Sequence, residues 1–145
     1  MSATGLPVFD RTLHETNLWL KELMALLETD DRAKAFGILR ATLHALRDRV
    51  GTENAVHLAA QLPILLRGVY YEGWHVAGTP TRERHADAFL DHIRREAPME
   101  SDADTELAAR AVFEVMWKRL DQGEIAKLIR MLPAELRELW TGVDA

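Results

Sequence analysis

Apolar residues recur along this chain at intervals of three, four and seven positions, the spacing that places them on one face of an α-helix. Four such stripes cover residues 9–27, 36–50, 89–93 and 112–120. No stretch of six residues alternates apolar and polar side chains with an excess of β-branched residues, so the pattern predicts no β-strand. We therefore predict an all-α fold built as a helical bundle.

Capping residues and prolines divide the stripes into about eight helices, two of them short. Asp31 and Thr81 each precede a helical pattern, and both residue types cap helix starts well. Pro63 and Pro133 fit the first turn of a helix, where the missing N–H removes no hydrogen bond. Glycine and proline mark residues 73–80 as the longest irregular connector.

The second half of the chain repeats the first half at an offset of 70 residues. Identical residues at that offset include Leu20 and Leu90, Leu62-Pro63 and Leu132-Pro133, and Leu66-Arg67 and Leu136-Arg137. We predict one repeat unit over residues 9–74 and a second over residues 81–140, each with two long and two short helices. A unit of about 60 residues buries its core only marginally, so we expect both units to pack into a single all-helical domain over residues 9–140.

The composition excludes several classes of function. The chain is 48% hydrophobic and 28% charged, with a net charge of −5, so it lacks the basic excess that binding to nucleic acid requires. It has no cysteine, which excludes disulfides, thiolate metal sites and thiol catalysis. No apolar run reaches the length of a membrane span, and the first ten residues lack the pattern of a secretory signal. We expect a cytoplasmic protein that binds neither nucleic acid nor a membrane.

Residues 67–75 form the most distinctive segment of the chain. They hold the six candidate site residues, namely Arg67, Tyr70, Tyr71, Glu72, Trp74 and His75. Tyrosine and tryptophan combine a large apolar area with a polar tip, which suits interfaces and pockets. The second unit keeps only Arg137 and an aromatic residue, Trp140, at equivalent positions. The segment therefore either fills the seam between the units or binds a ligand or partner, and the sequence leaves both interpretations open.

Arg67 and Arg137 follow the same Leu-Pro step in the two units. A guanidinium carries five donors and needs acceptors, so we expect it to clamp helix-end carbonyls or a carboxylate rather than bind a free anion. An alternative function is a small-molecule or metal-dependent activity in a cleft between the two halves. That activity would use Arg67, Glu72 and His75, and it requires their side chains to converge.

Patterns for catalysis and for metal binding are weak. His85, His92 and Glu96 lie along one helix face, but residues seven apart are separated by about 10 Å, too far to share one ion. We predict that this face is solvated. The two serines, Ser2 and Ser101, do not stand on a strand-to-helix elbow, and neither His-Glu-x-x-His nor a glycine-rich phosphate loop occurs. We predict no cofactor and no metal site.

The run over residues 62–74, with residues 59–61 before it and the helix end at residues 47–49, resembles the bacterial family catalogued as domain of unknown function 2267. Residues 132–140 resemble the closing segment of the same family. The resemblance covers residues 9–140 and implies a small all-helical cytoplasmic protein of bacterial type, with no activity assigned. We expect a non-enzymatic interaction or structural role, in which the partner is another protein or a second copy of the chain.

Overall fold

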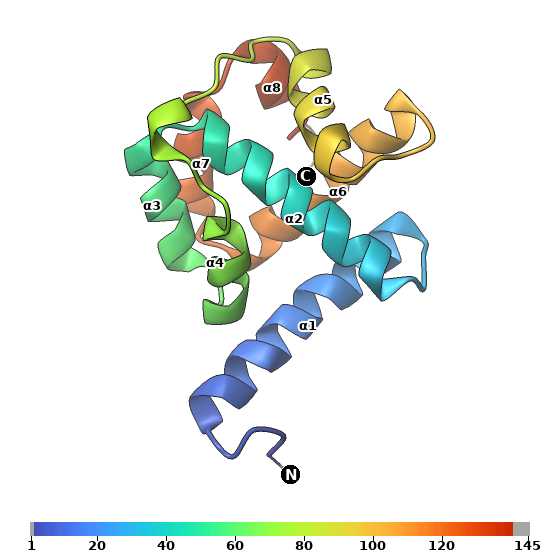
Figure 1. Cartoon of the computed structure of the whole chain (residues 1–145), viewed down its shortest axis with the longest axis vertical. Coiled ribbons are helices and arrows are strands. Elements are labelled where there is room, and N and C mark those ends of the chain that lie inside the picture. Colours follow the sequence, from blue (N-terminus) through green and yellow to red (C-terminus); the bar gives the residue numbers. More distant parts are fainter. Residues whose placement is uncertain (1, 141–145) are drawn as a thin grey trace.

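The computed structural model describes residues 2–140, in which every regular element is a helix (Figure 1). Its eight α-helices are α1 (Pro7–Leu27), α2 (Arg32–Arg49), α3 (Thr52–Gln61), α4 (Ile64–Tyr71), α5 (Ala86–Glu96), α6 (Asp102–Arg119), α7 (Gln122–Arg130) and α8 (Ala134–Glu138). One turn of 3-10 helix, η1 (Val76–Gly78), lies in the connector between α4 and α5. The predictions of an all-α fold and of about eight helices are confirmed. None of these helices is long and apolar enough to cross a membrane.

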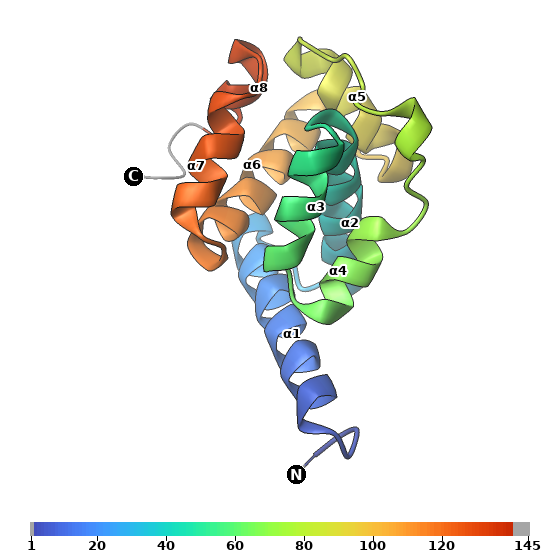
Figure 2. The same cartoon turned by 90° about the vertical axis from the view of Figure 1, so that its left-hand side faces the viewer.

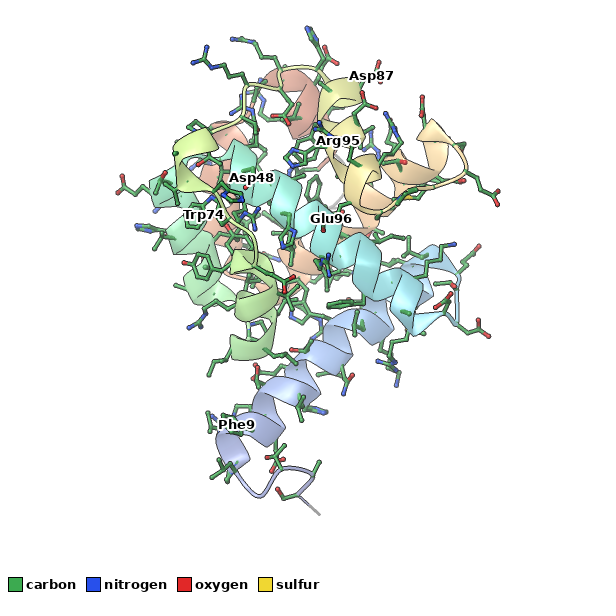
Figure 3. The ribbon with its side chains drawn as sticks, viewed as in Figure 1. Phe9, Asp48, Trp74, Asp87, Arg95 and Glu96 are labelled. Atoms are coloured by element: carbon green, nitrogen blue, oxygen red, sulfur yellow. The ribbon has the colours of Figure 1, made fainter. Side chains whose placement is uncertain are left out.

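Helix α2 forms the centre of the bundle and packs against α1, α3, α4, α5 and α6. Helices α1 and α6 also pack against each other, which brings helices of the two predicted units together. Figure 2 shows α7 and α8 along one side of the bundle and α4 and α5 along the other. The N-terminal half of α1 extends beyond the other helices in both views, and Phe9 lies near its end (Figure 3).

One hydrophobic core takes side chains from all eight α-helices. Leu43 and Leu46 of α2 are fully buried in it, as their spacing predicts. In the second half of the chain, Phe113 of α6 stacks on Trp140, with ring centroids 4.0 Å apart. The ring of Phe113 also lies 6.4 Å from that of Phe89 in α5. The helices of both predicted units therefore share one apolar interior.

The helix bounds follow the offset seen in the sequence. Helices α2, α3 and α4 start at Arg32, Thr52 and Ile64, and α6, α7 and α8 start 70 residues later, at Asp102, Gln122 and Ala134. The side chains of Asp31 and Ser101 each accept a hydrogen bond from a backbone N–H in the first turn that follows, at 3.0 and 3.1 Å. The first helices differ, because α1 has 21 residues and α5 has 11. That the two halves superimpose as repeats stays a prediction.

Three of the predicted helix starts differ from the observed ones. Thr81 does not cap a helix, because α5 starts only at Ala86. The backbone N–H of Thr81 instead donates to the carbonyl of Asp48 at 2.7 Å, which holds the connector beside the end of α2. Pro63 and Pro133 stand at the N-cap positions of α4 and α8, one residue before the first helical turn.

The aromatic packing in the core leads to a first prediction. Phe113 is 1% exposed and Leu107, on the same helix, is 64% exposed. Phe113→Ala should lower the free energy of unfolding by about 3–5 kcal/mol, because it leaves a cavity beside Trp140. Leu107→Ala should change it by less than about 0.5 kcal/mol. Urea unfolding followed by far-ultraviolet circular dichroism measures both, and equal shifts for the two variants would contradict the described core.

Candidate functional site

The six candidate residues lie where α4 ends and the connector begins, and they differ in exposure. Tyr70 is buried, Arg67, Tyr71 and Trp74 are half-buried, and Glu72 and His75 are exposed. The Tyr70 hydroxyl donates to the carbonyl of Ala55 in α3 at 2.8 Å, and burial raises the pKa of Tyr70. Tyr70 therefore belongs to the core and offers no surface to a partner.

Tyr71 and Trp74 form a stacked pair at the surface, which we call the aromatic pair. Their ring centroids are 5.6 Å apart and their planes meet at 24°. Gly73 between them has a φ of +73°, a conformation that disfavours any side chain, so glycine allows the turn that stacks Trp74 on Tyr71. The ring centroids of Tyr70 and Tyr71 lie 5.5 Å apart in an edge-to-face arrangement, so the pair rests on the core.

A buried cation, Arg47, holds the backbone on both sides of Tyr71. Its side chain is 5% exposed and lies in the last turn of α2. One terminal nitrogen donates to the carbonyls of Tyr70 and Glu72 at 2.7 and 3.0 Å, and Nε donates to Asp48 at 2.7 Å. The last carbonyls of a helix lack partners within it, and a positive charge is favourable there. Arg47 thus caps α4 from another helix.

His44, one turn earlier on α2, makes a second buried contact with the end of α4. Its Nε2 lies 2.7 Å from the carbonyl of Val69 and its Nδ1 lies 2.8 Å from a carboxylate oxygen of Glu96. Because a carbonyl only accepts, Nε2 carries a proton and donates. Glu96 also accepts from Nε of Arg40 at 3.4 Å. Glu96 is exposed, as predicted for this helix face, but its carboxylate does more than meet solvent, because it links α5 to α2.

His92 departs from the predicted solvated face. Its side chain is 20% exposed, with Nδ1 3.0 Å from a Glu83 oxygen and Nε2 3.4 Å from an Asp48 oxygen. Hydrogen bonds with Asp48 and Glu83 raise the pKa of His92 to about 9, against the opposing effect of burial. Burial is the largest single effect on both carboxyls and raises their pKa values. The hydrogen bond and charge of His92, together with further hydrogen bonds such as that from Arg47 to Asp48, outweigh burial, so both pKa values are lowered. His85 does lie at the surface, where it pairs with Glu135 at 2.7 Å.

These contacts form a polar frame behind the aromatic pair, made of His44, Arg47, Asp48, Glu83, His92 and Glu96 (Asp48 and Glu96 are labelled in Figure 3). The frame joins the end of α2 to α5 and to the connector. Arg49 extends it, because its Nε donates to the carbonyl of Glu83 at 2.7 Å. Within residues 2–140 no group of three histidine, aspartate or glutamate side chains is placed to hold a metal ion.

Arg67 clamps a helix end, as the sequence predicts. Its guanidinium donates to the carbonyls of Ala59, Ala60 and Leu62 at 2.9, 3.3 and 3.1 Å, and so caps α3. The side chain of Arg137 is exposed, so the equivalent arginine of the second half differs in environment.

The structure does not bring Arg67, Glu72 and His75 together. Arg67 lies at the end of α3, whereas a Glu72 oxygen lies 3.9 Å from a terminal nitrogen of Arg40 on α2. His75 is exposed at the N-cap of η1. The alternative function, an activity in a cleft that uses these three residues, requires their side chains to converge. The structure does not show that convergence.

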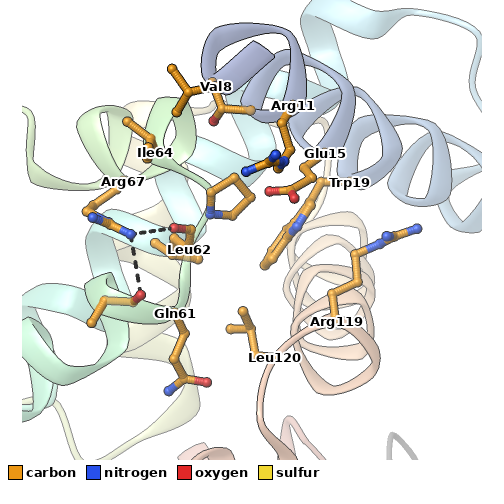
Figure 4. Close-up of a pocket in the computed structure, with 13 residues that line it drawn as sticks. Val8, Arg11, Glu15, Trp19, Gln61, Leu62, Ile64, Arg67, Arg119 and Leu120 are labelled. Carbon is orange, nitrogen blue, oxygen red and sulfur yellow. Dashed lines mark hydrogen bonds between the residues drawn. The ribbon is translucent and has the colours of Figure 1, made fainter.

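A cleft of about 470 Å³ does lie between helices of the two predicted units (Figure 4). Its walls come from α1, from the turn between α3 and α4, and from the end of α6. Trp19 and Leu120 supply apolar surface, and Arg11 and Glu15 supply charge. Arg67 is the one candidate residue among those that line it.

The outer side of α4 carries an exposed apolar strip that ends at the aromatic pair. Ile64, Gly68 and Tyr71 follow one another at helical spacings of four and three, and Leu65 lies beside them. Ile64 is 55% exposed and Leu65 43%. A side chain at Gly68 would meet no atom within 4 Å, so the strip is open to solvent at its centre. We call Ile64, Leu65, Gly68, Tyr71 and Trp74 the α4 face.

A comparison with protein families identifies the family of the chain. The family model described as an uncharacterized conserved protein (DUF2267) matches residues 16–139. That range contains the whole of α2 to α8, the polar frame and all six candidate residues. No curated protein matches the chain.

The paired histidine of the frame predicts a dependence of stability on pH. The pKa of His92 is about 9 in the folded protein and 6.5 in the absence of partners. Its contribution to stability is therefore complete below pH 6.5 and is lost as the pH rises through 9. We expect the free energy of unfolding to fall by about 1–3 kcal/mol over this interval. In His92→Gln most of that fall should be absent.

Urea unfolding at a series of pH values between 6 and 9.5 measures this effect. His85→Gln is the matched control. His85 stands at the N-cap of α5, the helix that contains His92, and its side chain is 77% exposed. It should keep the slope of the wild-type protein. An unchanged slope in His92→Gln would show that the ion pairs of His92 do not contribute.

The buried arginine yields a separate prediction. Arg47→Met keeps much of the side-chain volume but removes the donors to the carbonyls of Tyr70 and Glu72, so it should cost about 2–4 kcal/mol. Arg40→Met, on the same helix, removes a cation that is 41% exposed at its side chain and should cost less than about 1 kcal/mol. Urea unfolding gives both values. Similar losses for the two variants would refute the capping role of Arg47.

Proposed function

The chain belongs to the DUF2267 family of uncharacterized conserved proteins, and on that premise we propose that it is a non-enzymatic protein-interaction module. Its partner is another protein, which docks on the α4 face. The observation that carries the proposal is an exposed apolar strip that ends in stacked aromatic rings. We place this module in the bacterial cytoplasm, a reducing compartment that suits a chain without cysteine.

The chemistry of the α4 face suits a protein partner. Ile64 and Leu65 leave apolar area in water that a partner would bury, and burial of such area favours association. Tyr71 and Trp74 add large rings with few rotatable bonds, and residues of these types carry much of the binding energy in protein interfaces. Val76, two residues after Trp74 in the connector, is a further exposed apolar residue, at 46%.

The polar frame lowers the cost of binding at this face. Association is weakened when side chains and loops must be ordered on contact. Here Arg47 holds the carbonyls before and after Tyr71, and His44 holds that of Val69. The aromatic pair therefore presents one arrangement before any partner arrives.

Charged side chains of both signs lie beside the apolar strip. Glu72 is exposed, and one of its oxygens lies 3.9 Å from a nitrogen of Arg40. A partner with opposite charges at the matching positions would be oriented by them, since charges at an interface rim contribute more to specificity than to affinity. The favoured partner therefore presents an apolar strip with mixed charges beside it.

Binding is favoured over catalysis by the geometry of the candidate residues. The donors of Arg67 are used by three carbonyls of the chain itself. Glu72 faces Arg40 rather than Arg67 or His75. A general acid or base must lie within hydrogen-bond reach of a reacting group that other residues hold in place. The side chains of Arg67, Glu72 and His75 do not meet around any one position where such a group could bind.

A blocking substitution tests the proposal. Gly68→Arg adds a long side chain at the centre of the α4 face, where a Cβ meets no atom within 4 Å. Gly37→Arg is the matched control, because Gly37 is also helical and also has open space at its Cβ position. Both variants should fold at least as stably as wild type, since glycine costs about 1 kcal/mol inside a helix.

The partner is captured by a photoreactive amino acid at position 65 in cells of the native host and is identified by mass spectrometry. Titration calorimetry with the purified partner then measures affinity. Gly68→Arg should weaken binding at least about 30-fold, the loss expected at an interface centre, and Gly37→Arg should not. Equal affinity of Gly68→Arg and wild type would refute the proposal. So would capture of a second copy of the chain as the sole partner.

A further inference from the structure

A larger cavity of about 760 Å³ lies between the turn that joins α1 to α2 and the loop that joins α5 to α6. These two connections adjoin on the same side of the molecule (Figure 1). The volume falls within the range of small-molecule sites, about 300–1,000 Å³. Several of the lining residues are paired by the offset of 70, namely Glu28 with Pro98, Lys34 with Asp104, and Ile38 with Ala108. The cavity shares no residue with the α4 face.

The floor of this cavity is apolar. Ile38 and Ala108 are buried in it, and Met99 is half-buried. Two leucines at its edge are left open to water, because Leu26 is 38% exposed and Leu107 is 64% exposed. A ligand that enters would cover apolar surface on both connections at once. The occupant therefore needs an apolar body.

The rim of the cavity is acidic. Glu28, Glu100 and Asp104 line it, against a single cation, Lys34. Within residues 2–140 no ion pair joins any of these three carboxylates to a basic side chain. The acidic excess favours a positively charged group on the occupant and disfavours an anion.

Glu28 is an unfavourable residue for its position in the backbone. Its φ and ψ are 54° and 45°, and it is the single non-glycine residue with a positive φ within residues 2–140. Glycine is the usual residue at such a helix end, and a negative charge there opposes the helix dipole. Glycine would avoid both costs. Glutamate stands at this position despite both costs, and it lines the cavity.

We propose that this cavity binds a small organic ammonium ion with an aliphatic or aromatic body. The body lies against Ile38 and Ala108, and the ammonium group sits at the acidic rim. An ammonium has three N–H donors, and charge-assisted hydrogen bonds to a carboxylate are the strong ones. The carboxylate of Glu28 accepts one of them. This site is independent of the α4 face and of the proposed protein partner.

Alkylammonium ions below their micelle-forming concentrations test the proposal, with the carboxylate octanoate as a probe of opposite charge. Titration calorimetry should show that octylammonium binds about tenfold more tightly than hexylammonium, since each buried methylene contributes about 0.8 kcal/mol. Octanoate should bind at least about tenfold more weakly than octylammonium. In a nitrogen–proton correlation spectrum, the shifted amides should fall within residues 26–38 and 98–108.

Variants of Glu28 distinguish an effect on ligand binding from an effect on the stability of the fold. Glu28→Gln should weaken octylammonium binding about three- to tenfold. Glu28→Gly should weaken it similarly while raising the urea midpoint of unfolding, because glycine relieves the backbone. Gly68→Arg blocks the α4 face and should leave amine binding unchanged.

Three results would each overturn the proposal. The first is an affinity for octanoate that equals that for octylammonium. The second is wild-type affinity in both variants of Glu28. The third is the absence of binding at the cavity, shown either by shifted amides on α4 or by no binding of octylammonium at millimolar concentration. A failure of this kind leaves the protein-interaction proposal intact, because the two experiments probe different residues.

Discussion

The buried charge of Arg47 is the constraint on which the contacts between the end of α2, the end of α4 and the connector depend. A helix that ends inside a protein leaves carbonyls that need donors, and Arg47 supplies them to α4 from α2. Its buried charge in turn needs Asp48, and the charge of Asp48 is balanced by His92. The series continues to Glu83 in the connector, whose side chain is 12% exposed. The position of the aromatic pair is therefore determined by electrostatics behind it as much as by its own stacking.

Helices were predictable because their signals are local. The apolar stripes and the cap at Asp31 depend on residues within a few positions of one another, and the structure confirms them. The start at Thr81 was wrong because its N–H bonds to Asp48, far away in the sequence. His92 was wrongly placed in solvent for the same reason, since its two carboxylate partners come from other elements.

The candidate site was predictable in residue type but not in arrangement. The density of aromatic residues indicated a special segment, and two rings do stack at the surface. Nothing in the sequence separates Tyr70, which enters the core, from its neighbour Tyr71. Nor does His44, which stands beside an apolar stripe, reveal that it meets Val69 and Glu96 across the fold.

The N-terminal end of α1 has a consequence for how the molecule opens. From Pro7 to about Arg11 this helix extends past its neighbours and is held mainly by its own backbone hydrogen bonds and by the Ser2 and Thr4 contacts with Asp10. Beyond Thr12, whose hydroxyl accepts the N–H of Leu65, the helix is anchored to the bundle. Short isolated helical turns unwind at little cost. Deuterium should therefore replace the amide protons of this end long before it reaches those of the same helix after Thr16.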